Sequence, residues 1–276
     1  MSFHISAHDN QNRAIAVPGK HLSLIYFNLI RLEPGARYLL DQTGLETHIV
    51  PMHGMIDIHA GDHSFHRVGG RDSVWAGRAD SVYAGSGGEV VIEAISACEV
   101  AIAGAVCEET YLPFRVTPDE VDPVVVGSSD THSKREIFHL LGQNGEGRSG
   151  RLLVSELYCE PGCWSGYPPH KHDTDRDGET DHEELYHYRF QPETGFGGQF
   201  LYREGEARKV VMTEHGDTVL VAEGYHPTVT SPGHAEYIFT ILAGRTTRGL
   251  LQHFEERHAH LKDEIPGIKD MQAKFR

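Results

Sequence analysis

The chain has 276 residues, and its 25 Lys and Arg against 40 Asp and Glu give a formal net charge of −15 at pH 7. This length suits one large or two medium domains, and a hydrophobic content of 39% is enough for an ordinary core. A surface this acidic repels nucleic acid and anionic lipid, so we expect neither as a partner.

The N-terminal stretch MSFHISAHDNQNR has no apolar core of the kind that a signal peptide needs. The sequence also contains no run of about 18 apolar residues, so we expect no membrane segment and a soluble, cytoplasmic protein. Disulfides are rare in that compartment. We therefore expect the four cysteines to be reduced thiols in or near the core: Cys98, Cys107, Cys159 and Cys163.

Short apolar runs separated by turn residues predict an all-β sandwich or barrel, because 30 Gly and 13 Pro punctuate the chain throughout. A first β-rich block runs from about residue 21 to 105, and a second from about 133 to 254. The Pro-rich segment between them, residues 113–133, is expected to be a linker. The charged segment 255–276 predicts a short helix followed by a loose tail.

The most informative pattern combines three histidines and one glutamate. Pro168-Pro169 excludes a helix, so His170 and His172, two residues apart, are expected on one face of an extended segment. Glu184 opens the next strand, and His226 follows a glycine turn after another strand. Three imidazoles and a carboxylate suit one borderline divalent ion such as Zn, Mn, Fe, Co or Ni, with Zn or Mn favoured.

A second metal motif overlaps the first. Asp173-x-Asp175-x-Asp177-Gly followed by five residues and Glu184 matches the pattern of an EF-hand calcium loop. An EF-hand needs a helix on each side, whereas two prolines precede this loop and an alternating aromatic strand follows it. We interpret the loop as an acidic, solvated connection between the two strands that carry the ligands.

The same residues carry a family resemblance. Two stretches resemble the cupin motifs, with Ala222 where a Pro is usual in the second: Gly162…His170-x-His172…Glu184…Gly195 and Gly216…Gly224-x-His226. Three longer stretches resemble the 5-deoxy-glucuronate isomerase family of bacterial inositol catabolism, which is related to 4-deoxy-L-threo-5-hexosulose-uronate ketol-isomerase: residues 164–173, 183–190 and 224–227.

The resemblance implies an all-β fold of two cupin domains, each a jelly-roll β-barrel, in tandem with a short helical C-terminal tail. Residues 1–120 would form a cupin without a metal site, and residues 121–276 a metal-binding cupin with linker and tail. The implied reaction is the aldose–ketose isomerisation of 5-deoxy-D-glucuronate to 5-dehydro-2-deoxy-D-gluconate in myo-inositol catabolism. The implied partner is this small deoxy-uronate substrate, and a homo-oligomer is compatible with the family.

Candidate catalytic residues follow from strand alternation and from the charge of the substrate. If Glu184 faces inward, Tyr186 and Tyr188 also face inward, where they could transfer protons, orient the sugar or simply line the barrel. A uronate carboxylate calls for a cation, and Arg151 or Arg189 could serve.

Cupins host many chemistries, so two other functions stay open. A metal-dependent cupin oxygenase or oxidase would use the same ligands and would consume oxygen. A non-catalytic sugar-binding bicupin would keep the barrels without needing an open metal position.

Overall fold

The computed structural model describes residues 4–274, which divide into two compact units. The N-terminal unit comprises residues 9–122 and 140–154. The C-terminal unit comprises the described residues of 1–8, 123–139 and 155–276. The chain therefore does not divide at a single residue, because a segment from each half of the sequence belongs with the other half.

The N-terminal unit contains two antiparallel sheets, in the strand orders β10-β7-β4-β9-β2 and β3-β8-β5-β6. Its core is made of buried aliphatic side chains such as Ile30, Ile49, Ile56 and Ile102. The strands are β2 (Ile25–Leu32), β3 (Arg37–Asp41), β4 (Leu45–His53), β5 (Met55–Ala60), β6 (His63–Gly69), β7 (Ser81–Ala84), β8 (Glu89–Ala94), β9 (Cys98–Val106) and β10 (Phe114–Val116); 3-10 turns lie at Pro118–Glu120 and Gln143–Gly145.

The C-terminal unit is built around a seven-stranded sheet in the order β1-β19-β16-β21-β13-β12-β11 and a four-stranded sheet in the order β14-β20-β17-β18. A third, two-stranded sheet pairs β15 with β22. The strands are β1 (His4–Ile5), β11 (Val124–Val126), β12 (Arg135–Leu141), β13 (Leu152–Cys159), β14 (Trp164–Ser165), β15 (His170–Lys171), β16 (His182–Gln191), β17 (Phe196–Leu201), β18 (Lys209–Glu214), β19 (Thr218–Val221), β20 (Thr228–Thr230), β21 (Ala235–Gly244) and β22 (His253–Phe254).

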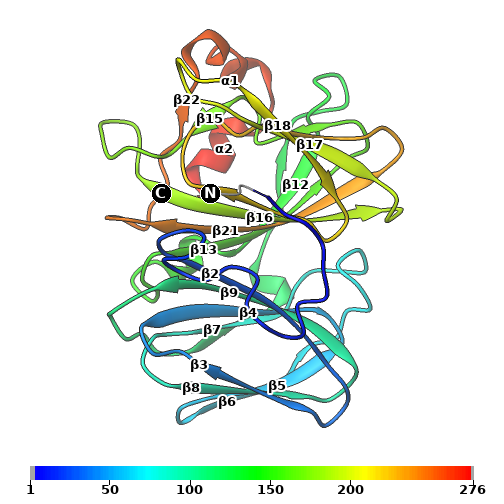
Figure 1. The fold of residues 1–276 in the computed structure, drawn as a ribbon, viewed down its shortest axis with the longest axis vertical. Helices are drawn as coiled ribbons and strands as arrows, with labels where there is room; N and C mark the ends of the chain where they lie inside the picture. Colours follow the sequence, from blue (N-terminus) through cyan, green and yellow to red (C-terminus); the bar gives the residue numbers. More distant parts are fainter. Residues whose placement is uncertain (1–3, 275–276) are drawn as a thin grey trace. The chain divides into compact units, whose positions relative to one another are not determined.

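The C-terminal tail is short and helical, as the sequence predicts. It contains a 3-10 turn at Glu256–His258, α1 (Leu261–Glu264) and α2 (Ile268–Ala273), and α2 packs against β11. Figure 1 shows this orange and red segment folded back onto its own unit. The all-β class with a helical tail is thus confirmed, and among the described residues no helix is long and apolar enough to span a bilayer.

Two smaller expectations have different outcomes. All four cysteines are free and buried, as expected. The segment 113–133 is more than a linker, because β10 joins a sheet of the N-terminal unit and β11 forms an edge of the seven-stranded sheet. Both are runs of three residues with valine or phenylalanine at alternate positions, which is too short a pattern for a strand prediction from sequence.

Strand alternation in β16 determines which of its side chains enter the C-terminal unit. Tyr186, Tyr188 and Phe190 belong to the hydrophobic core of this unit, and Glu184 lies on the same face. The strand is central, because it pairs with both β19 and β21, and Glu184 lies opposite Val221 and Leu242. A polar side chain on this face is therefore buried under a layer of aromatic and aliphatic residues.

In the N-terminal unit, the fully buried Glu46 ties the segment 140–154 to the rest of the unit. Its carboxylate accepts hydrogen bonds from the amides of Gly150, Arg151 and Leu152 at 2.8, 2.6 and 2.9 Å, and from the Tyr83 hydroxyl at 2.7 Å. Hydrogen bonds to a charged acceptor are the strong ones, and a buried donor that loses its partner is costly.

We expect Glu46→Gln to lower the free energy of unfolding by roughly 2–3 kcal/mol, because the amide group would face the three N–H donors with only one acceptor. Urea unfolding followed by circular dichroism measures this loss. Glu89→Gln, the same change at an exposed position of β8, is the control and should stay within about 0.5 kcal/mol of the unsubstituted protein. Equal stability of the two variants would contradict the assigned role of Glu46.

Candidate active site

Three strands bring the predicted ligand residues together in the C-terminal unit. His170 lies in β15, whose pairing with β22 places it opposite Phe254. Glu184 lies in β16, opposite Val221 of β19. The chain turns after Val221 and returns through His226 toward β20, so His226 lies beside Glu184 although 42 residues separate them (226 − 184).

The four side chains converge in a buried cluster. Ligand nitrogens of His170, His172 and His226 all lie within 4.8 Å of one another. Glu184 Oε2 is 3.0 Å from His172 Nε2 and 3.2 Å from His226 Nε2. Each of the four residues is at most 6% exposed, so the cluster is shielded from bulk water.

Backbone carbonyls orient all three imidazoles. The Nδ1 atoms of His170, His172 and His226 lie 3.0, 3.1 and 2.8 Å from the carbonyl oxygens of Pro168, His182 and Gly224. A carbonyl only accepts, so each Nδ1 carries a proton and each Nε2 is the ring nitrogen that faces the other side chains of the cluster. Hydrogen bonds of this kind are typical of the histidines that hold metal ions.

The electrostatics of the cluster favour a cation. Burial and the neighbouring imidazoles lower the pKa of His170 to about 3, so this residue is neutral at pH 7. Burial alone would raise the pKa of Glu184, but the hydrogen bond from His172 and the closeness of His226 outweigh burial and lower that pKa. Burial alone would lower the pKa of His172, but the hydrogen bond with Glu184 and the charge of that carboxylate outweigh burial and raise the pKa.

These residues fit a divalent metal ion. His226 Nε2 is buried without a hydrogen-bond partner, and it points at the same space as the ionised carboxylate and the other imidazoles. A buried polar atom without a partner is rare in proteins and calls for a missing ligand. Three neutral nitrogen donors and one carboxylate oxygen form a donor set suited to a transition metal.

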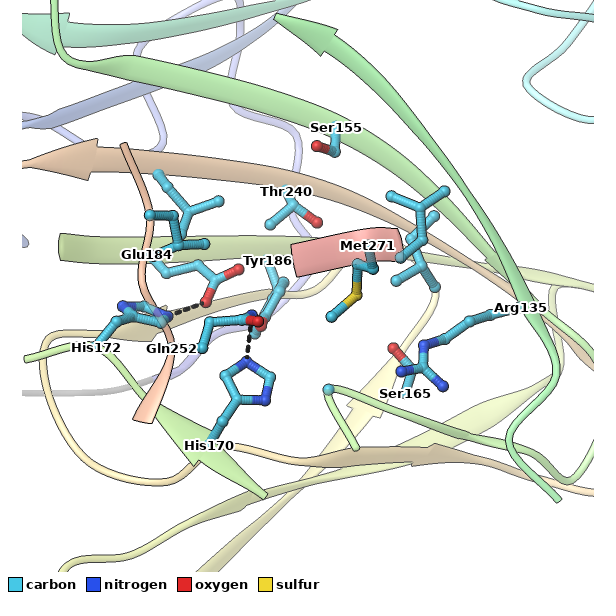
Figure 2. A pocket seen from close by; sticks show the side chains of 15 residues that line it. Arg135, Ser155, Ser165, His170, His172, Glu184, Tyr186, Thr240, Gln252 and Met271 are labelled. Carbon is cyan, nitrogen blue, oxygen red and sulfur yellow. Dashed lines mark hydrogen bonds and ion pairs between the residues drawn. The ribbon is translucent and has the colours of Figure 1, made fainter. Parts of the chain in front are cut away.

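The cluster opens into a cavity of about 60 Å³ inside the C-terminal unit. Figure 2 shows His170, His172 and Glu184 at one end of it and Arg135 with Ser165 at the other, with Tyr186 and Met271 between them. The walls are otherwise mainly aliphatic, from Ile137, Leu157, Leu242 and Leu250. The cavity is therefore a mainly apolar space with charged groups at its two ends, and the hydroxyls of Ser155, Thr240 and Tyr186 lie along its walls.

The last part of the chain, residues 250–271, contributes to the walls of this cavity. Met271 of α2 and Leu250 line it, and the Gln252 amide lies 3.0 Å from His170 Nε2 (Figure 2). Because His170 Nδ1 carries the proton, the Gln252 amide donates to the Nε2 lone pair.

The other predicted site residues have different positions. Tyr186 lines the cavity, whereas the Tyr188 hydroxyl is buried and donates to Gln199, whose amide holds the His226 carbonyl. Arg151 lies in the N-terminal unit, and neither it nor Arg189 is among the residues that line the cavity. Burial, the charge of Glu184 and Tyr188 raise the pKa of Tyr186, so its hydroxyl stays protonated.

The carboxylates of Asp173 and Asp175 in the acidic loop 173–181 form hydrogen bonds and ion pairs with other residues of the chain. Strands β15 and β16 flank it, not helices. Asp173 is half-buried and is paired with Lys171 and the Gly224 amide, so our description of it as a solvated loop residue is wrong. Asp175 accepts hydrogen bonds from the Asp181 amide and the Thr246 hydroxyl, which leaves few carboxylate oxygens for calcium.

Comparison with known proteins agrees with the geometry. Residues 3–261 match the model of the KduI/IolB family. The chain is 32% identical over 230 residues to a 5-deoxy-glucuronate isomerase of Bacillus licheniformis, covering 82% of this chain and 84% of the relative. It is 34% identical over 227 residues to the protein of the same name from Listeria monocytogenes, covering 81% and 82%.

Solved structures show the same fold. An IolB-like protein from Salmonella typhimurium LT2 is similar with a TM-score of 0.83 and 27% identity, over 95% of this chain and all of that one. Oxalate decarboxylase from Bacillus subtilis is similar with a TM-score of 0.63, over 100% of this chain and 86% of that one. Its identity is only 12%, so it shows the cupin fold alone. The predicted tandem cupin class is confirmed.

We expect His170→Ala and Glu184→Gln each to lose the bound divalent ion, because each removes one donor from a four-ligand site. Mass spectrometry of the metals retained after dialysis measures this. The matched controls, His63→Ala and Asp175→Asn, change an exposed histidine and an exposed loop carboxylate and should retain the ion. About one ion per chain is expected in the unsubstituted protein.

Two results would contradict the assignment. A full metal complement in the His170→Ala protein would remove this histidine from the site. Tight calcium binding that Asp175→Asn abolishes would assign Glu184 to the acidic loop instead.

Proposed function

The chain belongs to the KduI/IolB family, and we propose that it is an aldose–ketose isomerase that converts 5-deoxy-D-glucuronate to 5-dehydro-2-deoxy-D-gluconate in myo-inositol catabolism. The observation that carries the proposal is the convergence of three imidazoles and an ionised carboxylate at one end of a cavity. The relatives that share the name 5-deoxy-glucuronate isomerase support the choice of reaction.

We propose that His170, His172, Glu184 and His226 hold one divalent transition metal, with zinc or manganese favoured. When bound, such an ion polarises the carbonyl and hydroxyl oxygens of the sugar and stabilises the negative charge that develops as a proton leaves carbon. Four protein ligands leave one or two coordination positions for these oxygens.

Residues of the cavity wall would assist the proton transfer. Isomerisation moves a proton between the two adjacent carbons, so a group that donates a hydrogen bond to the reacting oxygens lowers the barrier. Tyr186 is suited to this role, because its pKa is raised and its hydroxyl is available as a donor rather than as a base. The apolar walls and the C-terminal tail exclude water, which strengthens such interactions.

Incubation with 5-deoxy-D-glucuronate in D₂O, followed by proton NMR, is the direct assay. We expect the aldehyde signal to decrease and the signals of the keto product to grow. If the transferred proton exchanges with solvent, deuterium should appear at the carbon that receives it. An oxygen electrode should record no uptake, because isomerisation is redox-neutral overall. Oxygen consumption in step with substrate loss would favour the oxygenase or oxidase, and binding without turnover would favour the sugar-binding protein.

We expect Tyr186→Phe to lower kcat by about 100-fold, the usual contribution of a positioned proton donor. Metal content should stay unchanged, because the hydroxyl is not a proposed ligand. Steady-state kinetics with metal analysis on the same samples checks both. Tyr158→Phe removes a hydroxyl outside the cavity and should keep kcat near that of the unsubstituted enzyme. A kcat for Tyr186→Phe within a few-fold of that enzyme would assign Tyr186 to packing only.

A further inference from the structure

Arg135 carries a buried guanidinium without a countercharge. The residue is 2% exposed, and it lies at the start of β12, among the strands of the C-terminal unit. Nη1 donates to the Ser133 carbonyl at 2.8 Å and Nη2 to the Tyr167 carbonyl at 2.7 Å. Among residues 4–274, no carboxylate forms an ion pair with it.

A buried guanidinium in this position lowers the stability of the folded protein. Moving a charged group out of water costs several kcal/mol unless an opposite charge or a full set of hydrogen bonds compensates. Burial lowers the pKa of Arg135 only to about 10, so the group stays charged at neutral pH. Two carbonyls engage two of its five N–H donors, and the others remain for a ligand.

The position of Arg135 explains what that ligand is. Its guanidinium lies at the end of the cavity opposite Glu184 and the histidines (Figure 2). Tyr186 lines the cavity between these two ends (Figure 2). The two carbonyl contacts hold the guanidinium in place, as preorganised recognition requires.

We propose that Arg135 binds the carboxylate of the sugar acid and thereby makes the enzyme selective for uronates over neutral sugars. This inference rests on the proposed isomerisation and deepens it, because it names the group that recognises the far end of the substrate. The carboxylate supplies the missing countercharge, and the reacting carbonyl end of the same molecule then lies at the histidine cluster. Guanidinium and carboxylate geometries match in bidentate pairs, which sets the direction of the bound sugar.

The kinetic test compares two substrates. One is 5-deoxy-D-glucuronate, and the other is 5-deoxy-D-glucose, in which a hydroxymethyl group replaces the carboxylate. The unsubstituted enzyme should prefer the uronate in kcat/KM. Arg135→Gln should lower kcat/KM for the uronate by roughly 100-fold and leave the neutral sugar nearly unchanged, so the preference collapses. Arg135→Lys should keep part of the preference for the uronate. Lys134→Gln, at the partly exposed neighbouring position, should leave kcat/KM unchanged for both substrates.

A purely structural role of Arg135 predicts a different result. Loss of its contacts to Ser133 and Tyr167 would lower kcat/KM for both substrates alike and would leave the ratio intact. An unchanged ratio in Arg135→Gln, with full metal content, would therefore overturn the proposal. Equal use of both sugars by the unsubstituted enzyme would overturn it too and leave the proposed isomerisation standing.

A binding measurement tests the carboxylate site even if the protein does not catalyse the proposed isomerisation. Isothermal titration should show that D-glucuronate binds the unsubstituted protein more tightly than D-glucose does. Arg135→Gln should remove that difference. If the protein turned over neither deoxy sugar yet bound glucuronate through Arg135, the proposed reaction would fail and the carboxylate site would stand. If neither variant distinguished the two sugars, the carboxylate site would be wrong.

Discussion

Glu184 holds an ionised carboxylate at almost full burial, a state that is costly unless positive charge or hydrogen-bond donors compensate it. Glu236, on the same sheet, shows the alternative. It is fully buried, neither of its oxygens has a hydrogen-bond partner among the described residues, and burial raises its pKa to about 8. The difference between these two glutamates is the ring of imidazoles around Glu184. His172 and His226 are thus what keeps a charged ligand oxygen inside the barrel.

The fold provides this arrangement through strand pairing. Alternation in β16 directs Glu184 and Tyr186 inward together, and pairing with β19 delivers His226 to the same level. Pairing of β15 with β22 places His170 beside the tail that carries Gln252. Each imidazole is then oriented by a carbonyl near its own strand, so the nitrogen lone pairs are aligned before any ion arrives. Tyr188 adds to this through Gln199, which holds the His226 backbone.

The sequence predicted this half of the site because its signals are local. His170 and His172 share one extended segment, Glu184 and Tyr186 share one strand, and His226 follows a glycine turn. Arg135 gave no such signal, since its strand is separated from β16 in the sheet by β21 and β13. The tail residues Gln252 and Met271 were missed for the same reason: only the folded-back chain places them over the cavity. Asp173 was misjudged because one of its partners, the Gly224 amide, lies 51 residues away in the sequence and comes close only in the folded chain.

The cavity has a polarity that a uronate matches. A divalent ion held by Glu184 and the histidines would leave net positive charge at one end, and Arg135 is a cation at the other, while the walls between are mainly apolar. An anionic sugar acid relieves the uncompensated charge of Arg135, whereas a neutral sugar leaves it in place. Gln252 connects the cavity wall to the ligand cluster, because it lines the cavity and its amide lies 3.0 Å from His170 Nε2. The end of the chain and the ligand cluster are therefore in direct contact.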